Sequence, residues 1–303
     1  MNIIGRRKIW YLISLVLIVP GIIALFLWKI PTGIDFKGGT LLDIQYSKTT
    51  SKEQVQNALN EAGVKNANVQ ESGVDFIIRT GSLDQTGQQN LQDALKKAGE
   101  YRQNRLETVG PTVSRDLKKK AIIVVVLASM AIIIYIAIAF RKVPKPASSW
   151  RFGICAFLAL IHDLAFVTGV FAILGHFLGY EVDSLFITAL LTIMGFSVHD
   201  TIVVFDRIRE NLRKSPSLDF ETNVNNSILQ TLNRSLNTSF TVLIVLLALY
   251  LLGGQTLKHF MLALLIGVSI GTYSSIFNAS PLLVSWQLWS ARRMTRASEK
   301  VAS

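Results

Sequence analysis

The sequence has few charged residues and almost no cysteine, and both shortages exclude whole classes of protein. Only 17% of the 303 residues are charged, against about 25% in an ordinary soluble domain. Half of the residues are apolar and the mean hydropathy is +0.40, which excludes a disordered chain and argues against a cytosolic enzyme. The single cysteine, Cys155, excludes an internal disulfide framework and a cysteine-rich zinc site.

Long apolar runs account for much of the chain. A helix that crosses a bilayer needs about 20 mostly apolar residues. Six runs are long enough, and they are Ile9–Trp28, Ala121–Phe140, Phe152–Leu174, Ser184–Phe205, Leu236–Leu252 and Phe260–Trp289. Three basic residues precede the first run, as in a signal peptide, but the run is too long for one and no small-residue cleavage site follows. We therefore expect six retained transmembrane helices.

The positive charges lie at particular ends of these runs. The chain has 31 Lys and Arg against 20 Asp and Glu. With the N-terminus in the cytoplasm, the cytoplasmic segments are rich in Lys and Arg, whereas the short outer loops Gly175–Asp183 and Gly253–His259 contain only Lys258. Because Lys and Arg near span ends stay in the cytoplasm, we expect both termini there, in a cytoplasmic (inner) membrane. Topology and contact with anionic lipid explain the basic excess, so it indicates no nucleic acid.

The segment between the first two runs has the composition of a small soluble domain. Alternating and helical patterns predict four strands and two helices, in the order β-α-β-β-α-β of a ferredoxin-like domain. The strands are 40–46, 67–71, 74–80 and 101–109, with a hairpin at 72–73, and the helices are 51–62 and 83–98. Ser51 is the expected N-cap of the first helix. Since this fold implies no chemistry by itself, we expect a docking module outside the membrane.

Together these patterns predict the fold class and the domain boundaries. The fold is an α-helical polytopic membrane protein with six transmembrane helices and a small α+β ferredoxin-like domain. The expected domains are a cytoplasmic tip with the first helix (1–30), the extracytoplasmic domain (31–118), helices two to six (119–290) and a basic cytoplasmic tail (291–303).

A glycine-rich stretch opens the outer domain. Its sequence is GIDFKGG, and its distinctive residues are Gly33, Asp35, Phe36, Gly38 and Gly39. Paired glycines suit a tight turn where the chain leaves the membrane. The stretch is either a structural elbow or a hinge by which the domain swings, and the sequence leaves both possibilities open.

Two carboxylates fall inside apolar runs, Asp163 in the third and Asp200 in the fourth. An Asp at the centre of a span costs about 2.5–3.5 kcal/mol on insertion, so it needs a partner or a function. His162 and His199 precede them, either as packing residues or as proton relays. Neighbouring residues on a helix point about 100° apart, so His199 is expected on the flank of its helix. Asp163 is a structural carboxylate or a second coupling residue.

Arg234 precedes the fifth apolar run and supplies a permanent cation. A nearby cation favours the ionised form of a carboxylate, whereas burial favours the neutral form. A pair formed by Asp200 and Arg234 is therefore either a static ion pair or a proton-coupled switch. At the inner boundary we expect an interfacial charge cluster, formed by Asp206, Arg207, Arg209 and Glu210. In the outer loop we expect the acidic residues Glu181 and Asp183 to be solvated.

An enzyme is not expected. Asp163 and Asp200 could serve an intramembrane aspartyl protease, but neither lies in a Tyr-Asp or Gly-x-Gly-Asp context. A Walker A loop needs Lys and then Ser or Thr directly after its last glycine, and Gln255 follows the glycines at 253–254. We therefore expect no catalytic residues, no cofactor and no metal.

Four stretches resemble the SecF family of bacterial Sec-dependent protein export, which belongs to the resistance-nodulation-division (RND) superfamily. They are GIDFKGG (33–39), DTIVVFDRIREN (200–211), QTLNRSLNTS (230–239) and GVSIGTYSSIFNAS (267–280). The family's intramembrane Asp and Arg match Asp200 and Arg234, and its His-Asp pair matches His162 and Asp163. Where the family usually has Asn, this chain has His199, which either alters the pH range of coupling, acts as a second relay site or replaces the hydrogen bond of the amide.

The resemblance implies half of an RND-type bundle that uses the proton motive force to promote preprotein export. It implies SecD as an obligate partner, together with the Sec translocon channel, its associated subunits and the translocating preprotein. Two alternatives stay open. The chain could be half of a proton-driven efflux or lipid exporter, or a structural subunit that holds the translocon together.

Overall fold

The computed structural model describes residues 1–47, 50–64, 67–72, 75–141, 143–144 and 148–302. It divides into two compact units. A helical unit comprises Met1–Pro31, Val124–Tyr180 and Leu185–Ser303, and an outer unit comprises Thr32–Ile123 and Glu181–Ser184.

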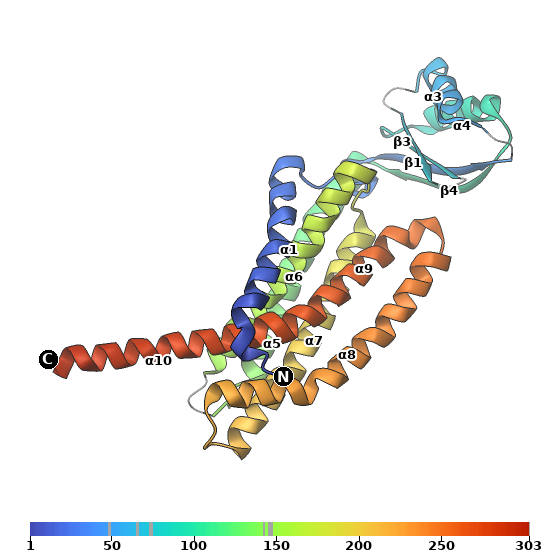
Figure 1. The fold of residues 1–303 in the computed structure, drawn as a ribbon. Coiled ribbons are helices and arrows are strands. Elements are labelled where there is room, and N and C mark those ends of the chain that lie inside the picture. Colours follow the sequence, from blue (N-terminus) through green and yellow to red (C-terminus); the bar gives the residue numbers. More distant parts are fainter. Residues whose placement is uncertain (48–49, 65–66, 73–74, 142, 145–147, 303) are drawn as a thin grey trace. The chain divides into compact units, whose positions relative to one another are not determined.

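Six helical segments are long and apolar enough to cross a membrane, which confirms the predicted number of spans (Figure 1). The helices of these segments are α1 (Arg7–Trp28), α5 (Pro111–Ala139), α6 (Ser149–Leu178), α7 (Ser184–Lys214), α8 (Phe220–Leu252), α9 (Gln255–Ser274) and α10 (Ser280–Ala302). A 3-10 turn (Ile4–Arg6) precedes α1, and a π-helical turn, η2 (Ser275–Ala279), joins α9 to α10. The helix α8 begins 16 residues before the predicted apolar run, because Asp219 caps it by accepting a hydrogen bond from the Thr222 N–H.

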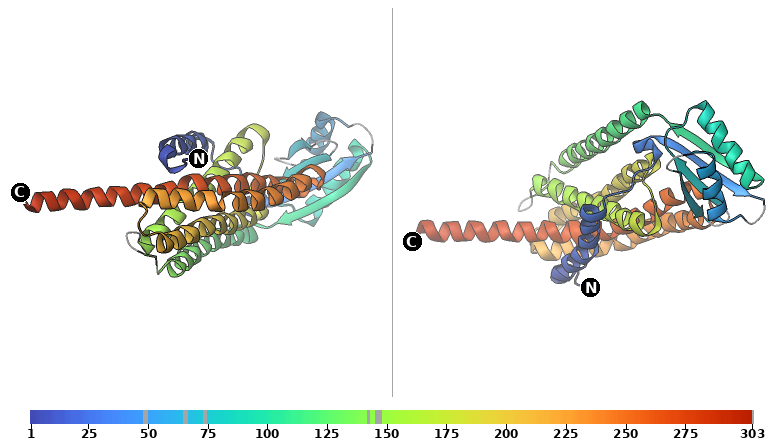
Figure 2. Two further views of the ribbon diagram at one scale, coloured as in Figure 1. Left: turned by 60° about the horizontal axis from the view of Figure 1, so that its bottom comes forward. Right: turned by 90° about the horizontal axis from the view of Figure 1, so that it is seen from above.

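Small residues let the helices of this unit approach closely. Helix α1 packs along α6, and α8 packs along α9 (Figure 2). At the first contact, a Cβ added to Gly169 would lie 2.6 Å from Gly21 Cα. Where α9 meets α7, a Cβ on Gly271 would lie 3.0 Å from Ser197 Cβ. Glycines at such positions bring helix backbones together in membranes, and here they bring α1 against α6 and α9 against α7.

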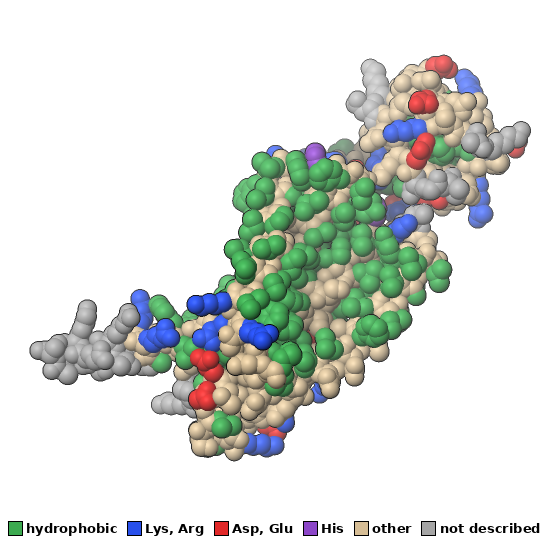
Figure 3. All heavy atoms as spheres, in the orientation of Figure 1, with side chains coloured by type: hydrophobic (Ala, Val, Ile, Leu, Met, Phe, Trp, Pro, Cys, Tyr) green, Lys and Arg blue, Asp and Glu red, His purple; other side chains and the backbone are tan. Residues whose placement is uncertain are grey.

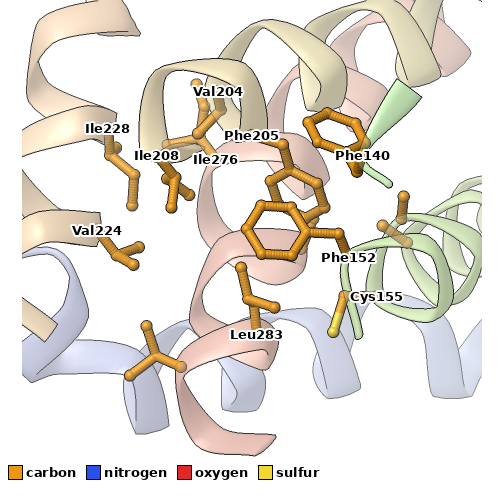
Figure 4. Close-up of a cluster of buried hydrophobic side chains, with 14 of the residues drawn as sticks. Phe140, Phe152, Cys155, Val204, Phe205, Ile208, Val224, Ile228, Ile276 and Leu283 are labelled. Atoms are coloured by element: carbon orange, nitrogen blue, oxygen red, sulfur yellow. The ribbon is translucent and has the colours of Figure 1, made fainter. Parts of the chain in front are cut away.

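Aromatic packing closes one end of this unit. The rings of Phe152 (α6) and Phe205 (α7) lie 4.9 Å apart at 71°, and Phe140 lies 5.9 Å from Phe205 at 79° (Figure 4). All three are fully buried, and the free Cys155 lies in the same cluster. Edge-to-face pairs of this kind add about 0.5–1.5 kcal/mol each beyond area burial. The cluster therefore fixes α6 and α7 against each other near Asp200.

The surface of the helical unit is largely apolar. Figure 3 shows hydrophobic side chains over most of its visible face, whereas Lys and Arg gather at the end from which α10 extends. Large apolar residues are exposed along the whole of α1 and α5. Such a surface suits contact with lipid or with another membrane protein rather than with water.

The outer unit has the predicted β-α-β-β-α-β order. Its elements are β1 (Gly39–Tyr46), α3 (Lys52–Glu61), β2 (Asn68–Ser72), β3 (Asp75–Thr80), α4 (Gln85–Ala98) and β4 (Tyr101–Val109), preceded by the short α2 (Ile34–Lys37). The four strands form an antiparallel sheet in the order β2-β3-β1-β4, which confirms the ferredoxin-like fold. Ser51 caps α3 in a reciprocal capping box with Gln54, as predicted. The expected turn at Gly73 lies outside the described residues.

The core of this unit lies between the sheet and its two helices. Buried side chains from β1, α3, β2, β3 and α4 form it, among them Leu42, Ile44, Leu59, Ile78 and Leu95, and partly buried residues of β4 pack against it. In the glycine-rich stretch, Gly38 and Gly39 have φ values of +77° and +137°, and a Cβ on Gly39 would lie 2.5 Å from the Thr80 carbonyl oxygen. The predicted tight turn is confirmed, because only glycine fits both positions without strain.

One prediction about the outer loop is wrong. Glu181 was expected to be solvated, but its carboxylate forms an ion pair with Arg79 of β3, with Nε and Oε2 2.8 Å apart. The charge of Asp183 acts on Arg105 of β4. The loop residues 181–184 therefore belong to the outer unit, which the apolar pattern of the flanking spans could not indicate.

Candidate proton-coupling site

Both predicted intramembrane carboxylates are buried in the helical unit. Asp163 of α6 has 0% and Asp200 of α7 has 2% of its surface exposed. The insertion cost of such groups predicts that each needs hydrogen-bonding partners. The two residues differ sharply in how well this need is met.

Asp163 is fully engaged. Its Oδ2 accepts hydrogen bonds from Ser197 Oγ at 2.5 Å and from Ser274 Oγ at 2.7 Å. Its Oδ1 lies 3.0 Å from His162 Nδ1. The two hydroxyls come from α7 and α9, so Asp163 holds three transmembrane helices together through one carboxylate.

His162 connects Asp163 to the surface of the bundle. Its Nε2 lies 3.3 Å from Asn278 Nδ2, and Asn278 Oδ1 accepts a 2.8 Å hydrogen bond from Ser14 of α1. A surface pocket of about 260 Å³ opens beside these residues and is lined by His162, Asn278, Ser14 and apolar neighbours. The imidazole therefore stands between a pocket and a buried carboxylate, which is the geometry that a proton relay requires.

Asp200 is poorly satisfied in comparison. Its one hydrogen bond among the described residues comes from Ser239 Oγ of α8, at 3.4 Å. The same Ser239 hydroxyl pairs with Thr272 Oγ1 of α9 at 2.6 Å. Ser235, one turn before Ser239, is 1% exposed, and its hydroxyl has no hydrogen-bond partner within the described part of the chain. The surroundings of Asp200 thus retain unused hydrogen-bonding capacity.

A four-residue repeat places hydroxyls along the buried face of α8. Its members are Ser227, Thr231, Ser235 and Ser239, and all are buried. Residues spaced by four lie on one side of a helix, so the face that reaches Asp200 through Ser239 carries a hydroxyl at each of four successive turns. The predicted site did not include this repeat, although its period is visible in the sequence.

A second pocket, of about 470 Å³, opens between α8 and α9. Ser239 and Thr272 line it together with Asn237, Ser269 and apolar residues. Since Ser239 also contacts Asp200, one hydroxyl separates the carboxylate from the surface of the unit. Each carboxylate therefore has its own polar path to a pocket, through His162 for Asp163 and through Ser239 for Asp200.

The π-helical turn η2 contributes to the region between the two carboxylates. Ser275, its first residue, donates a 3.0 Å hydrogen bond to the Ser197 carbonyl and lies 2.8 Å from Thr201 Oγ1. Single π-helical turns inside α-helices are frequent at functional sites. Asp163 and Asp200 share no hydrogen-bond partner in the described chain, so this arrangement does not form the shared carboxylate site that an aspartyl protease needs.

The expected pair between Asp200 and Arg234 is not formed. Arg234 is exposed on α8 and has no ion pair among the described residues. Its neighbour Ser235 occupies the buried position on that helix, and successive residues point about 100° apart, so Arg234 faces away from the interior. His199 is exposed on α7, on the flank, as predicted.

The predicted boundary cluster consists of ion pairs on α7. Arg209 pairs with Asp206, and Arg207 pairs with Glu210 at 2.6 Å. Lys214 joins Glu210 at 2.6 Å, and Arg207 donates to Gln230 of α8 at 2.6 Å. These contacts at spacings of three and four residues reinforce the polar end of α7.

Comparisons with known proteins identify the class to which this fold and site belong. Residues 90–289 match the family model of the protein export membrane protein SecD/SecF, C-terminal, and residues 33–50 match that of the SecD/SecF GG motif. The chain is thus an integral membrane protein of the SecD/SecF export class. Its arrangement is one six-span half of an RND-like bundle with a small outer domain.

Relatives over the full length narrow the assignment. The chain is 48% identical to the protein translocase subunit SecF of Thermobaculum terrenum, over 100% of this chain and 99% of the relative. It is 40% identical to the SecF of Anaerolinea thermophila, again over 100% and 99%. The chain belongs to the SecF family of protein translocase subunits.

Solved structures agree with this assignment. The crystal structure of SecDF from Thermus thermophilus, a translocon-associated membrane protein, matches 95% of this chain with a TM-score of 0.85 and 34% identity. A structure of SecDF in its super-membrane-facing form matches 99% with a TM-score of 0.70 and 32% identity. The chain spans 38% and 40% of those two longer chains.

Proposed function

We propose that this chain works with a SecD partner and uses the proton motive force to promote preprotein export. The observation that supports the proposal most is Asp200, a carboxylate that is 2% exposed yet has a single hydrogen bond, of 3.4 Å, to the residues that the structure describes. A buried carboxylate with so few partners gains from a proton, which removes its charge. A cation placed beside the ionised carboxylate stabilises it as well. If a helix movement brings that cation, proton binding and helix movement are coupled.

The energy available is sufficient for a switch of this kind. One charge that crosses 100 mV of membrane potential provides about 2.3 kcal/mol, and one pH unit provides about 1.36 kcal/mol. Together they shift a two-state population by roughly 10²–10³. A proton cycle at Asp200 therefore supports a modest ratchet that draws an emerging polypeptide outward or prevents it from sliding back.

Arg234 has a role in the second state of this cycle. Ser235 is buried and Arg234 is exposed in the present structure, and a rotation of α8 by about one residue, roughly 100°, exchanges Ser235 for Arg234. The ionised Asp200 then meets a guanidinium, and the protonated Asp200 meets hydroxyls. This alternation makes the position of α8 depend on the proton.

His162 and Asp163 form a second polar centre in the proposal. The hydrogen bonds of Asp163 to two other helices support a role as an anchor about which α7 and α9 move. The pocket beside His162 supports a relay that adjusts the protonation of this anchor. His199 is an additional titratable group on the flank of α7 and modifies the pH range of coupling.

The partners follow from the length of the SecDF chains and from the surface. SecD supplies the other six-span half, the translocon channel and its subunits receive the complex, and the preprotein contacts the outer domain. Anionic lipid neutralises the basic ends of the spans. In this arrangement both termini are cytoplasmic, the outer domain is extracytoplasmic, and the protein carries out no catalysis and holds no cofactor or metal.

The replacement Asp200→Asn tests the proposal. The amide has the same shape but cannot carry the charge, so we expect the complex to assemble while export driven by the proton motive force falls at least tenfold. The matched control is Asp206→Asn, on the same helix in an exposed ion pair, which leaves export within about twofold. Both variants are compared in membrane vesicles that contain the full complex with SecD and the translocon.

The outcomes separate the alternatives. Full export by the Asp200→Asn complex contradicts proton coupling and supports a purely structural subunit. A drug-sensitivity phenotype of the deletion strain, without an export defect, supports an efflux or lipid exporter. Co-purification of a second six-span protein in mild detergent, identified by mass spectrometry, tests the SecD partnership directly.

A further inference from the structure

The outer loop before α7 is bound into the outer unit by backbone contacts. Thr32 and Val182 form a parallel β-bridge, and the Gly33 N–H donates a 2.8 Å hydrogen bond to the Val182 carbonyl. Gly33 begins the glycine-rich stretch, so residues separated by about 150 positions in the sequence lie side by side. The stretch is thus anchored to the loop rather than free in solvent.

Asp35 of this stretch binds the first residue of α7. Its Oδ2 accepts a hydrogen bond from the Ser184 N–H at 2.8 Å and a second, short one from the Ser184 hydroxyl. The first N–H groups of a helix have no partner within the helix, and a carboxylate at that end is favoured by the helix dipole. Asp35 therefore caps a transmembrane helix from a distant part of the chain.

Two arginines of the sheet face the same loop. Arg79 of β3 pairs with Glu181 at 2.8 Å, and both side chains are largely buried, with 13% and 23% of their surface exposed. The pKa of Arg105 is raised above its ordinary value. The main cause is its hydrogen bond to Glu107, burial opposes the shift, and the charges of Glu107, Asp183 and Asp35 add to it. The loop is acidic where the sheet is basic, so charge complementarity adds to the backbone contacts.

We name these contacts the α7 clamp. It consists of the Asp35–Ser184 cap, the Gly33–Val182 backbone contact with its Thr32 bridge, and the Arg79–Glu181 ion pair. All of its members belong to the outer unit. The helix that begins at Ser184 continues without interruption to Lys214, and Asp200 lies 16 residues along it, or about 24 Å at 1.5 Å per residue.

We infer that Asp35 and Arg79 are positioning residues of the export cycle, which hold the outer domain on the first turn of the helix that carries Asp200. A movement of α7 then displaces the outer domain, because the helix is continuous and its first residue is clamped. This inference rests on the proposed function, since it explains how a proton event at Asp200 reaches the domain outside the membrane. It also replaces the free hinge by a clamp that stays closed through the cycle.

Replacement of the clamp residues tests the inference in the full complex with SecD. We expect Asp35→Ala and Arg79→Gln each to lower export driven by the proton motive force at least fivefold, while proton uptake by reconstituted complexes stays within twofold of wild type. The matched controls are Lys37→Ala, exposed in the same short helix, and Arg102→Gln, exposed on β4. Both leave export and proton uptake unchanged.

A disulfide supplies the decisive measurement. Bridged residues of neighbouring strands have the Cα separation that a disulfide needs, and the native Cys155 is buried, so Thr32→Cys with Val182→Cys adds a covalent clamp. We expect this bond to leave wild-type export unchanged and to restore the Asp35→Ala and Arg79→Gln variants. Reduction of the bond removes the rescue, which shows that the variants fold and differ only in the clamp.

Each contrary outcome overturns the inference. A disulfide that stops wild-type export shows that the clamp must open, and a disulfide that fails to rescue shows that Asp35 or Arg79 acts in another way. Unchanged export in both single variants shows that the clamp carries no movement. Failure of the proposed function is a different result. In that case Asp200→Asn has no effect on proton uptake or export, whatever the clamp variants do.

Discussion

The two buried carboxylates of the helical unit occupy contrasting surroundings. Asp163 accepts two short hydrogen bonds from α7 and α9 and contacts His162, whereas Asp200 has one long hydrogen bond from α8. Both are inside apolar helices at almost complete burial. Burial alone therefore does not distinguish the two residues. In the proposed cycle Asp163 is the anchor because its hydrogen bonds are satisfied, and Asp200 is the switch because it is free to change its partner.

The cause of this contrast is the number of helices that converge on each residue. Ser197 and Ser274 reach Asp163 from two helices whose backbones are brought close by Gly271. Asp200 meets the repeat of hydroxyls on α8, where Ser235 has no partner in the described chain. Four measurements test this contrast.

The largest expected difference concerns stability. Asp163→Ala leaves the hydroxyls of Ser197 and Ser274 without an acceptor, and each buried unsatisfied group costs about 1–3 kcal/mol. We expect a loss of about 3 kcal/mol or more in the free energy of unfolding, against about 1 kcal/mol or less for Asp200→Ala. Denaturant unfolding in mixed micelles measures both, and equal losses would contradict the contrast between anchor and switch.

The next effect concerns the glycine that supports Asp163. In Gly271→Ala the added methyl meets Ser197 Cβ at 3.0 Å and displaces the donor to Asp163, so we expect a loss of about 1–3 kcal/mol from overpacking. Gly195→Ala is the matched control, since nothing lies within 4 Å of its added Cβ and alanine favours a helix by up to about 1 kcal/mol. The same micelle unfolding assay compares them; equal destabilisation would show that the close approach is unimportant.

A smaller effect is expected for a buried carboxylate outside the membrane. Desolvation, followed by the charge of Asp75, raises the pKa of Asp43 against the opposing effects of Asn104 and Arg105, and Asp43 Oδ1 has no partner among the described residues. A raised pKa means that the folded state binds the proton more tightly, so wild-type stability increases as the pH falls through the folded pKa.

Asp43→Asn removes this titration. We expect the variant to stabilise the sheet at neutral pH, by an amount on the order of 1 kcal/mol, and the advantage to shrink as the pH falls toward the ordinary value of 3.8. Hydrogen exchange of the β1 amides in the full-length protein, corrected for intrinsic pH dependence, measures it. A stability advantage of Asp43→Asn that grows as the pH falls would contradict the raised pKa of Asp43.

The smallest expected effect is the coupling energy between Asp200 and Arg234 in unfolding, which we expect to be near zero. Since Arg234 is exposed and unpaired in the described chain, the effects of Asp200→Asn and Arg234→Gln on the unfolding of the chain alone should add within about 0.5 kcal/mol. In the export assay the double variant should be no worse than Asp200→Asn, because both act on one switch. A large coupling in unfolding would show that the pair is static.

Local patterns in the sequence were enough for much of the fold. The six spans, the strand and helix order of the outer domain and the Ser51 cap each depend on residues near one another in the chain. The burial of Asp163 and Asp200 follows equally from the apolar runs around them. The predicted pair of Arg234 with Asp200 was wrong. Ser235 and the rest of the hydroxyl repeat occupy the buried face of α8, so the neighbouring Arg234 is exposed.

Apolar length and the cost of a buried charge are properties of short stretches, so the amino-acid sequence was sufficient to predict which segments enter the membrane and which carboxylates enter with them. The packing of the folded chain, in contrast, established that Asp163 has more hydrogen-bond partners than Asp200 among the described residues, and that Asp35 caps α7. These contacts join residues far apart in the chain, and they depend on the rotation and approach of whole helices. Side-chain packing between helices sets that rotation; a local pattern such as the hydroxyl repeat of α8 can indicate the buried face of one helix, but not the residues that this face meets.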